Sequence, residues 1–101
     1  MTDQPAPVVC TLSPKELQNR HLEWGDIRTL SLTTSAVENG VLVTFPIKLA
    51  HSVEDLAERE NHCCGSWLST TTERLEDTIR LEITTQNPEG LPLILSMAGL
   101  A

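Results

Sequence analysis

An alternating run of apolar and other residues in the first half of the chain is the clearest indication of its fold. From Val41 to Leu49, every second residue is Val, Phe, Ile or Leu. A period of two is typical of a strand with one buried face. The dipeptide Asn39-Gly40 lies immediately before the run, and it is the strongest short signal for a hairpin turn. The strand is therefore predicted to place these residues on its covered face: Val41, Val43, Phe45, Ile47 and Leu49.

The first strand of this hairpin is expected within residues 26–36, where Leu30 and Leu32 alternate with polar residues. The second strand contains Pro46, which has no N–H to donate to a neighbouring strand. The end of that strand is therefore predicted to lie at a sheet edge. A second hairpin is expected from 67 to 84, because Ile79, Leu81 and Ile83 also alternate with polar residues.

Three helices are predicted, at residues 13–24, 52–65 and 91–100. The first has a serine as N-cap, a proline in its first turn and Gly25 as its stop signal. The second is capped by its first residue, a serine, and is ended by its last, a glycine. A short strand is also expected at residues 8–12.

These elements give the order strand–helix–strand–strand–helix–strand–strand–helix. Hairpins imply antiparallel pairing, and strands with one apolar face imply that helices cover that side. The predicted class is α+β, a two-layer fold with a mainly antiparallel sheet and helices on one face. Residues 8–101 are expected to form one domain after a polar tail at 1–7, since 101 residues suffice for a single modest core.

The charge and the composition of the chain argue against several classes of function. The chain has 14 Asp+Glu against 7 Lys+Arg, a net charge of −7, which disfavours binding to nucleic acid or to an anionic membrane. No apolar run is long enough to span a bilayer, and the first residues do not follow a signal-peptide pattern, so a cytoplasmic protein is expected. Assembly into a homo-oligomer and binding to a protein partner are both kept as alternatives. The 3 cysteines argue against a disulfide framework.

The helix at 52–65 carries the most distinctive chemistry. At about 100° per residue, Glu60 falls in the middle of the apolar stripe, while Glu58 and His62 fall on the opposite, solvent-facing side. Burying an unpaired carboxylate costs several kcal/mol. Glu60 is therefore predicted to be buried, either with polar partners or at the mouth of a cavity.

The same helix ends with two adjacent thiols, Cys63 and Cys64. One interpretation is structural, because free cysteine is among the most buried residue types. The other is functional, since a thiol pair can bind a soft ion such as Zn²⁺ or Cu⁺ or react with redox species. Cys10 is a candidate third metal ligand, if the fold brings it close. A helix C-terminus does not activate a thiol, so position alone indicates no reactive nucleophile.

The stretch from Glu60 to Cys64 resembles a group of small bacterial proteins with a Glu-x-x-Cys-Cys motif. The segments 10–17 and 88–90 resemble the same group, so the similarity extends over nearly the whole chain. Related segments occur behind DNA-binding domains of mercury-regulator (MerR-like) type. This chain departs from the group at Gly65-Ser66, where the group has proline and an aromatic residue. The resemblance implies a sensor or binding module, with these matched positions: Cys10, Glu60, Cys63 and Cys64.

The predicted function is a small cytoplasmic ligand-binding or sensor-like domain. Its ligand site is Glu60, Cys63 and Cys64, and its metal-ligand set is the two vicinal thiols with Cys10. The ligand is expected to be a soft metal or a thiol-reactive species. The alternative is a structural or protein-interaction module in which the cysteines only pack. A thiol enzyme ranks third, because no base or oxyanion arrangement is visible, and no catalytic residue is predicted.

Overall fold

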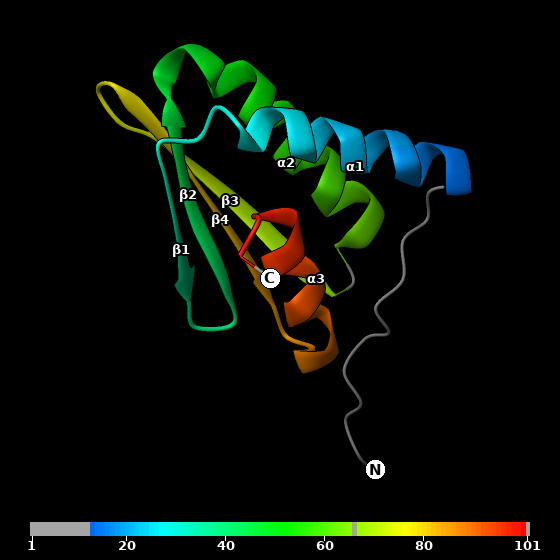
Figure 1. The fold of residues 1–101 in the computed structure, drawn as a ribbon. Helices are drawn as coiled ribbons and strands as arrows, with labels where there is room; N and C mark the ends of the chain where they lie inside the picture. Colours follow the sequence, from blue (N-terminus) through cyan, green and yellow to red (C-terminus); the bar gives the residue numbers. More distant parts are fainter. Residues whose placement is uncertain (1–12, 66, 101) are drawn as a thin grey trace.

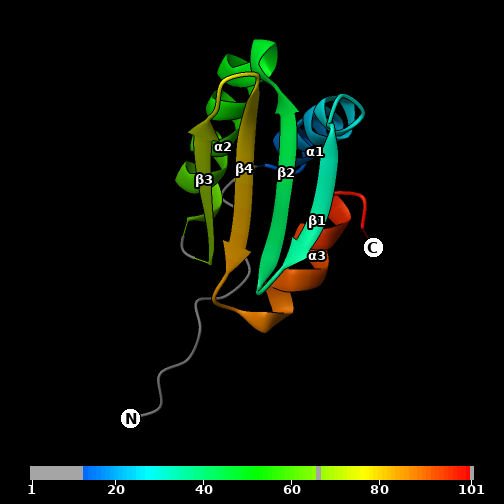
Figure 2. The same cartoon turned by 90° about the vertical axis from the view of Figure 1, so that its left-hand side faces the viewer.

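The computed structural model describes residues 13–65 and 67–100 and shows an α+β fold. In this part of the chain, four strands form one antiparallel sheet, and the helices lie on one face of it (Figures 1 and 2). The predicted fold class is thus confirmed, while the strand expected at 8–12 lies outside the described residues. The elements are α1 (Pro14–Arg28), β1 (Thr33–Val37), β2 (Gly40–Pro46), η1 (Ile47–Leu49), α2 (Ala50–Cys64), β3 (Leu68–Arg74), β4 (Thr78–Thr85), η2 (Pro88–Gly90) and α3 (Leu91–Met97).

The sheet has the strand order β1-β2-β4-β3, so two hairpins meet along β2 and β4. The predicted turn is confirmed: Val37 pairs with Gly40, and Asn39 between them has φ of 62°. Asparagine tolerates this left-handed conformation better than most residues. Gly40 is required for a different reason, since a β-carbon there would lie 1.9 Å from the carbonyl oxygen of Ile83 on the adjacent strand.

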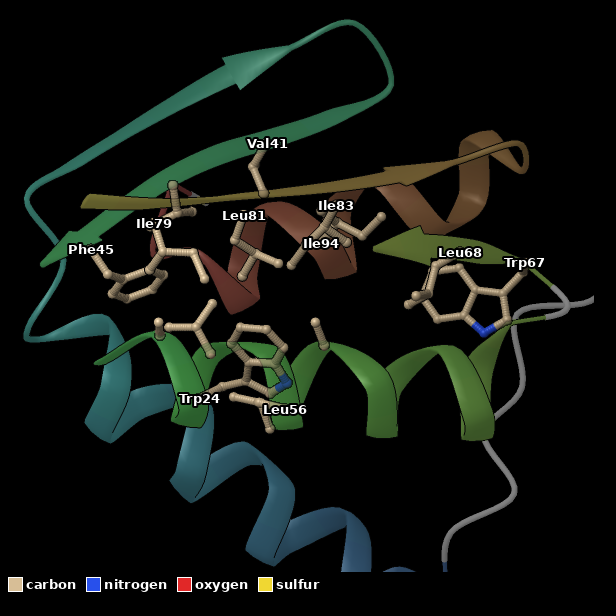
Figure 3. Packing of buried hydrophobic residues seen from close by; sticks show 14 residues of the cluster. Trp24, Val41, Phe45, Leu56, Trp67, Leu68, Ile79, Leu81, Ile83 and Ile94 are labelled. Carbon is tan, nitrogen blue, oxygen red and sulfur yellow. The ribbon is translucent and has the colours of Figure 1, made fainter. Parts of the chain in front are cut away.

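The core lies between the sheet and the helices (Figure 3). The alternation predicted for β2 is confirmed, because Val41, Val43 and Phe45 are buried while Leu42 and Thr44 are only partly buried. On β4 the three predicted apolar positions are buried as well. Each large aliphatic or aromatic side chain removed from water stabilises the fold by about 1.5–3 kcal/mol. The buried cluster consists of Trp24, Val41, Val43, Phe45, Ala50, Val53, Leu56, Ala57, Trp67, Leu68, Ile79, Leu81, Ile83 and Ile94.

The first helix is longer than predicted. α1 continues through Gly25 to Arg28, so the strand expected from residue 26 begins only at Thr33. A glycine inside a helix costs about 1 kcal/mol relative to alanine. Trp24 is buried in the core and Ile27 packs against it, and this burial on the last turns of α1 outweighs the cost of the glycine. Gly25 was therefore the wrong stop signal.

The second helix begins earlier than predicted. The chain leaves β2 after Pro46, makes the short η1 turn, and enters α2 at Ala50 rather than at Ser52. Ala50 is buried, which explains why the helix extends toward the core instead of starting at the serine cap. Ile47 and Leu49, predicted to continue the strand, instead pack against the edge of the core from η1.

Pro46 fits a sheet in which its strand is central. The N–H of the next residue, Ile47, donates to Asp77 on the β4 side at 3.0 Å, so the nitrogen of Pro46 faces the β1 side. The β1 ladder ends where Thr33 pairs with Thr44, before it reaches the proline. The prediction that this strand end lies at an edge therefore holds for one side of it, where no donor is needed.

Candidate functional site

Glu60 lies in the contact between α2 and α1, where only 4% of the residue is exposed. Glu58 and His62 are exposed, so the helical phase assigned from the sequence is confirmed for all three residues. A carboxylate at this depth requires compensation by charge or by hydrogen-bond donors.

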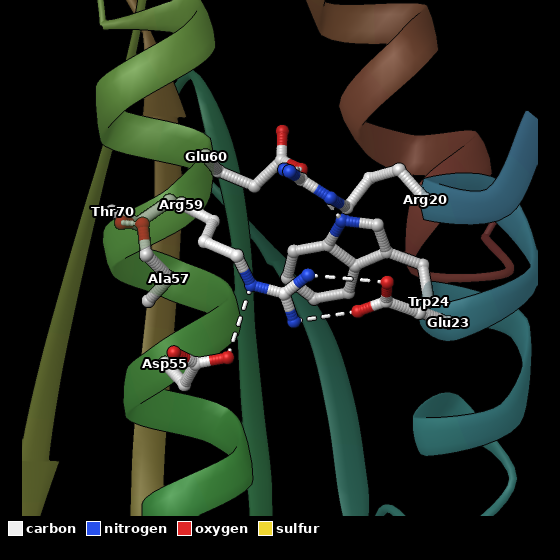
Figure 4. A network of polar contacts seen from close by, with 8 residues as sticks. All are labelled: Arg20, Glu23, Trp24, Asp55, Ala57, Arg59, Glu60 and Thr70. Atoms are coloured by element: carbon white, nitrogen blue, oxygen red, sulfur yellow. Dashed lines mark hydrogen bonds and ion pairs between the residues drawn. The ribbon is translucent and has the colours of Figure 1, made fainter. Parts of the chain in front are cut away.

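Two side chains of α1 supply that compensation (Figure 4). Arg20 forms an ion pair through Nη1 with Oε1 of Glu60, and Trp24 donates from its indole Nε1 to the same oxygen at 3.2 Å. Arg20 and Trp24 are four residues apart and therefore share one side of α1. The contact joins the middle of α1 to the C-terminal half of α2.

A second polar contact lies beside the first (Figure 4), and its side chains are more exposed. Arg59 donates from Nη1 and Nη2 to the two carboxylate oxygens of Glu23, at 3.1 and 2.5 Å. Its Nε is 3.0 Å from Oδ2 of Asp55, one turn earlier on α2. The hydrogen bond from Arg59 lowers the pKa of Glu23, and the same bond raises the pKa of Arg59, so both groups stay charged at neutral pH.

The cysteine pair forms the end of α2, whose last helical residue is Cys64 and whose C-cap is Gly65, the predicted stop signal. The side chains of Cys63 and Cys64, and the whole of Cys10, lie outside what the structure describes. The three-thiolate set therefore stays a prediction. What the structure does describe is the framework on either side of the thiols.

Hydrogen bonds hold the chain in place both before and after the cysteines. Before them, Asn61 donates to the carbonyl of Thr70 at 3.1 Å and accepts from its N–H at 2.8 Å. The hydroxyl of Thr70 in turn donates to the carbonyl of Ala57 at 2.8 Å. After them, the carbonyl of Trp67 accepts a hydrogen bond from the hydroxyl of Thr85 at 2.8 Å. Both ends of the thiol-bearing turn are thus attached to the sheet.

Among the side chains that the structure describes, which leave out those of Cys63 and Cys64, no three or more from His, Cys, Asp or Glu are grouped so as to hold a metal ion. A complete site would therefore need side chains beyond the described ones or groups from a ligand. Within residues 13–65 and 67–100, no helix combines the length and the apolar character needed to cross a membrane.

Comparison with known proteins does not assign the chain. No family model, no curated protein and no solved structure matches it. The resemblance to the bacterial Glu-x-x-Cys-Cys group consequently stays a prediction.

Sequence reasoning identified Glu60 but missed its partners. The position of Glu60 in an apolar stripe indicated that donors were needed, and Arg20 and Trp24 are four residues apart as a helical pair would be. Nothing in the sequence links them to Glu60, which is 40 and 36 residues away. Only the packing of α1 on α2 shows which donors are used.

Proposed function

We propose that the chain is a small ligand-binding or sensor-like domain whose binding site is the turn that carries Cys63 and Cys64. The ligand is a soft metal ion, Zn²⁺ or Cu⁺, or a thiol-reactive species such as a trivalent arsenical. Thiolates prefer such soft partners over hard cations such as Mg²⁺ or Ca²⁺. Glu60 acts as a positioning residue rather than as a ligand, because Arg20 and Trp24 already engage its Oε1.

One observation carries this proposal: the buried contact of Glu60 with α1 lies one helical turn before the thiols. The contact is reinforced by Asn61 and Trp67 on either side of the same turn. Ligand sites gain affinity when rigid elements hold the ligating residues near their bound geometry. The net charge of −7 also favours the approach of cations. A reducing compartment such as the cytoplasm would keep the thiols available.

The decisive experiment is native mass spectrometry of protein purified under reducing, chelator-free conditions. We expect one Zn²⁺ or Cu⁺ per chain, or one equivalent of phenylarsine oxide bridging the two thiols. The double variant Cys63→Ser with Cys64→Ser should abolish binding, and Cys10→Ser should weaken it only if that thiol is the third ligand. Glu60→Gln should weaken binding by about tenfold or more, as loss of a positioning group does in metal sites.

His62→Gln serves as the matched control, because this exposed side chain lies on the opposite side of the same helix turn. It should leave binding unchanged. If the wild-type protein takes up neither metal ion and does not react with the arsenical, the thiol-site proposal is wrong.

A second function, association between copies of the chain, is favoured by one specific observation. Among the strands that the structure describes, β1 lies at a sheet edge and carries neither charge nor proline across Thr33–Val37. Natural edge strands usually contain such groups, which prevent pairing with another chain. Leu30 and Leu32, just before β1, are 53% and 56% exposed. An antiparallel β1–β1 pairing would cover this edge in a symmetric dimer.

Light scattering coupled to size-exclusion chromatography tests this alternative. The wild-type chain should show a concentration-dependent dimer, and Ser35→Lys on β1 should shift it to monomer. Thr71→Lys, at an exposed position of the other edge strand β3, is the matched control and should leave the dimer intact. A chain that stays monomeric at all concentrations contradicts this function.

A further inference from the structure

An open groove of about 350 Å³ lies between α1 and α2, away from the thiol-bearing turn. Its apolar lining includes Ile27, Leu30 and Leu56, contributed by both helices and by the segment after α1. Leu30 is 53% exposed, so a large apolar side chain at the groove is left in contact with water. The volume is within the range of about 300–1,000 Å³ typical of small-molecule sites.

The charged lining of this groove is mainly acidic. It contains the carboxylates of Glu23, Asp26 and Asp55 against the single guanidinium of Arg59. That guanidinium is already engaged by Glu23 and Asp55. Asp26 takes no part in the ion pairs found among the described residues, so its charge is not neutralised by them. The groove therefore presents apolar surface next to excess negative charge.

We propose that this groove binds a small amphiphilic cation, an ammonium or guanidinium group attached to an aryl or alkyl chain. The cation would lie beside Asp26 and Asp55, and the apolar chain would cover Ile27 and Leu30. An anionic ligand is disfavoured, because the only guanidinium in the lining is held by two carboxylates. A neutral apolar ligand would bury the leucine but gain nothing from the carboxylates. This site is separate from the thiols and does not depend on the function proposed above.

The test is a titration of ¹⁵N-labelled full-length chain with 2-phenylethylammonium, followed by amide chemical shifts. Neutral 2-phenylethanol and anionic 3-phenylpropionate are the matched probes. We expect the ammonium to shift the amides of Ile27, Leu30, Ser52 and Asp55, with the alcohol binding about two- to fivefold more weakly. The carboxylate should produce no shifts at these residues. Added salt should weaken only the binding of the ammonium.

Two charge-removing variants make the test specific. Asp26→Asn should weaken the binding of 2-phenylethylammonium by about two- to fivefold. Glu58→Gln removes the same charge from the solvent-facing side of α2 and should leave the affinity unchanged. Equal binding of the alcohol and the ammonium would overturn the proposal. So would an equal loss in both variants, or the absence of shifts at the groove.

Discussion

Two ion pairs join α1 to α2 at neighbouring positions, yet their surroundings differ. In the inner pair, Arg20 and Glu60 have side chains that are 12% and 5% exposed. In the outer pair, Arg59 and Glu23 have side chains that are 39% and 43% exposed. Arg59 and Glu60 are adjacent in sequence, so one step along α2 turns a solvated contact into a buried one.

Burial, rather than contact geometry, therefore sets the loss of stability that follows when each pair is broken. The outer pair has the bidentate geometry that usually favours strength, but water screens it, and exposed pairs contribute about 0–1 kcal/mol. The inner pair gains little net stability over a well-packed apolar replacement, because both charges lose their hydration. Removing only one of its partners leaves a charge buried without compensation, which is far more costly.

The largest effect is expected for Arg20→Met. This change leaves the carboxylate of Glu60 buried without its cation, and it should lower the free energy of unfolding by about 3–5 kcal/mol in urea titrations. The double variant Arg20→Met with Glu60→Leu removes both charges and should recover most of that loss. If the double variant is as unstable as the single one, buried charge is not the cause.

Glu60→Gln should have the next largest effect. The amide keeps the shape of the side chain and an acceptor for Trp24, but it removes the negative charge beside Arg20. We expect a loss of about 1.5–3 kcal/mol at neutral pH, the range for a hydrogen bond to a charged group. An unfolding free energy equal to wild type from acid to neutral pH would show that this carboxylate has no special role.

Glu23→Gln breaks the outer pair and should cost at most about 1 kcal/mol. The difference from wild type should nearly vanish in about 1 M salt, where the screening length falls to about 3 Å. The inner-pair variants should respond much less to salt. A loss at Glu23 as large as that at Glu60 would contradict the comparison.

The smallest expected effect is the change with pH in the stability that the outer pair, Arg59 and Glu23, contributes. Because the hydrogen bond from Arg59 lowers the pKa of Glu23 below its usual 4.5, the folded state binds fewer protons than the unfolded one near that pH. The stabilisation is complete above 4.5 and is lost as the pH falls through the lowered pKa. The difference in stability between wild type and Glu23→Gln should therefore vanish on acidification. Thermal unfolding at several pH values can measure it. If this difference in stability instead widens on acidification, the pKa of Glu23 is not lowered by folding and the prediction is wrong.

The sequence predicted those features that depend on local patterns. Asn39-Gly40 fixed the first hairpin, and helical phase alone placed Glu60 inside and Glu58 outside. Where the prediction was wrong, tertiary packing overrode a local signal. Gly25 did not stop α1 because Trp24 and Ile27 pack against the core, and Ser52 did not start α2 because buried Ala50 precedes it.

The candidate site was less predictable for a related reason. Its key contact joins α1 to α2 through residues that are 40 and 36 positions apart in the sequence, and no short pattern encodes such a pairing. A buried carboxylate indicates that hydrogen-bond donors are needed, but the sequence alone does not say which of its five arginines and two tryptophans supply them. Which of them reaches Glu60 depends on how the helices cross over the sheet.

The arrangement of the sheet also has a consequence for how fast the chain folds. Both hairpins, β1–β2 and β3–β4, join neighbouring strands, whereas the central β2–β4 pairing brings together strands separated by η1, α2 and β3. Closing that long loop carries an entropy cost that the hairpins do not. We expect β2–β4 docking to limit the folding rate. Gly40 pairs with Thr84 against the backbone of β4, so a side chain there should slow folding itself, while changes at the outer ion pair should mainly accelerate unfolding.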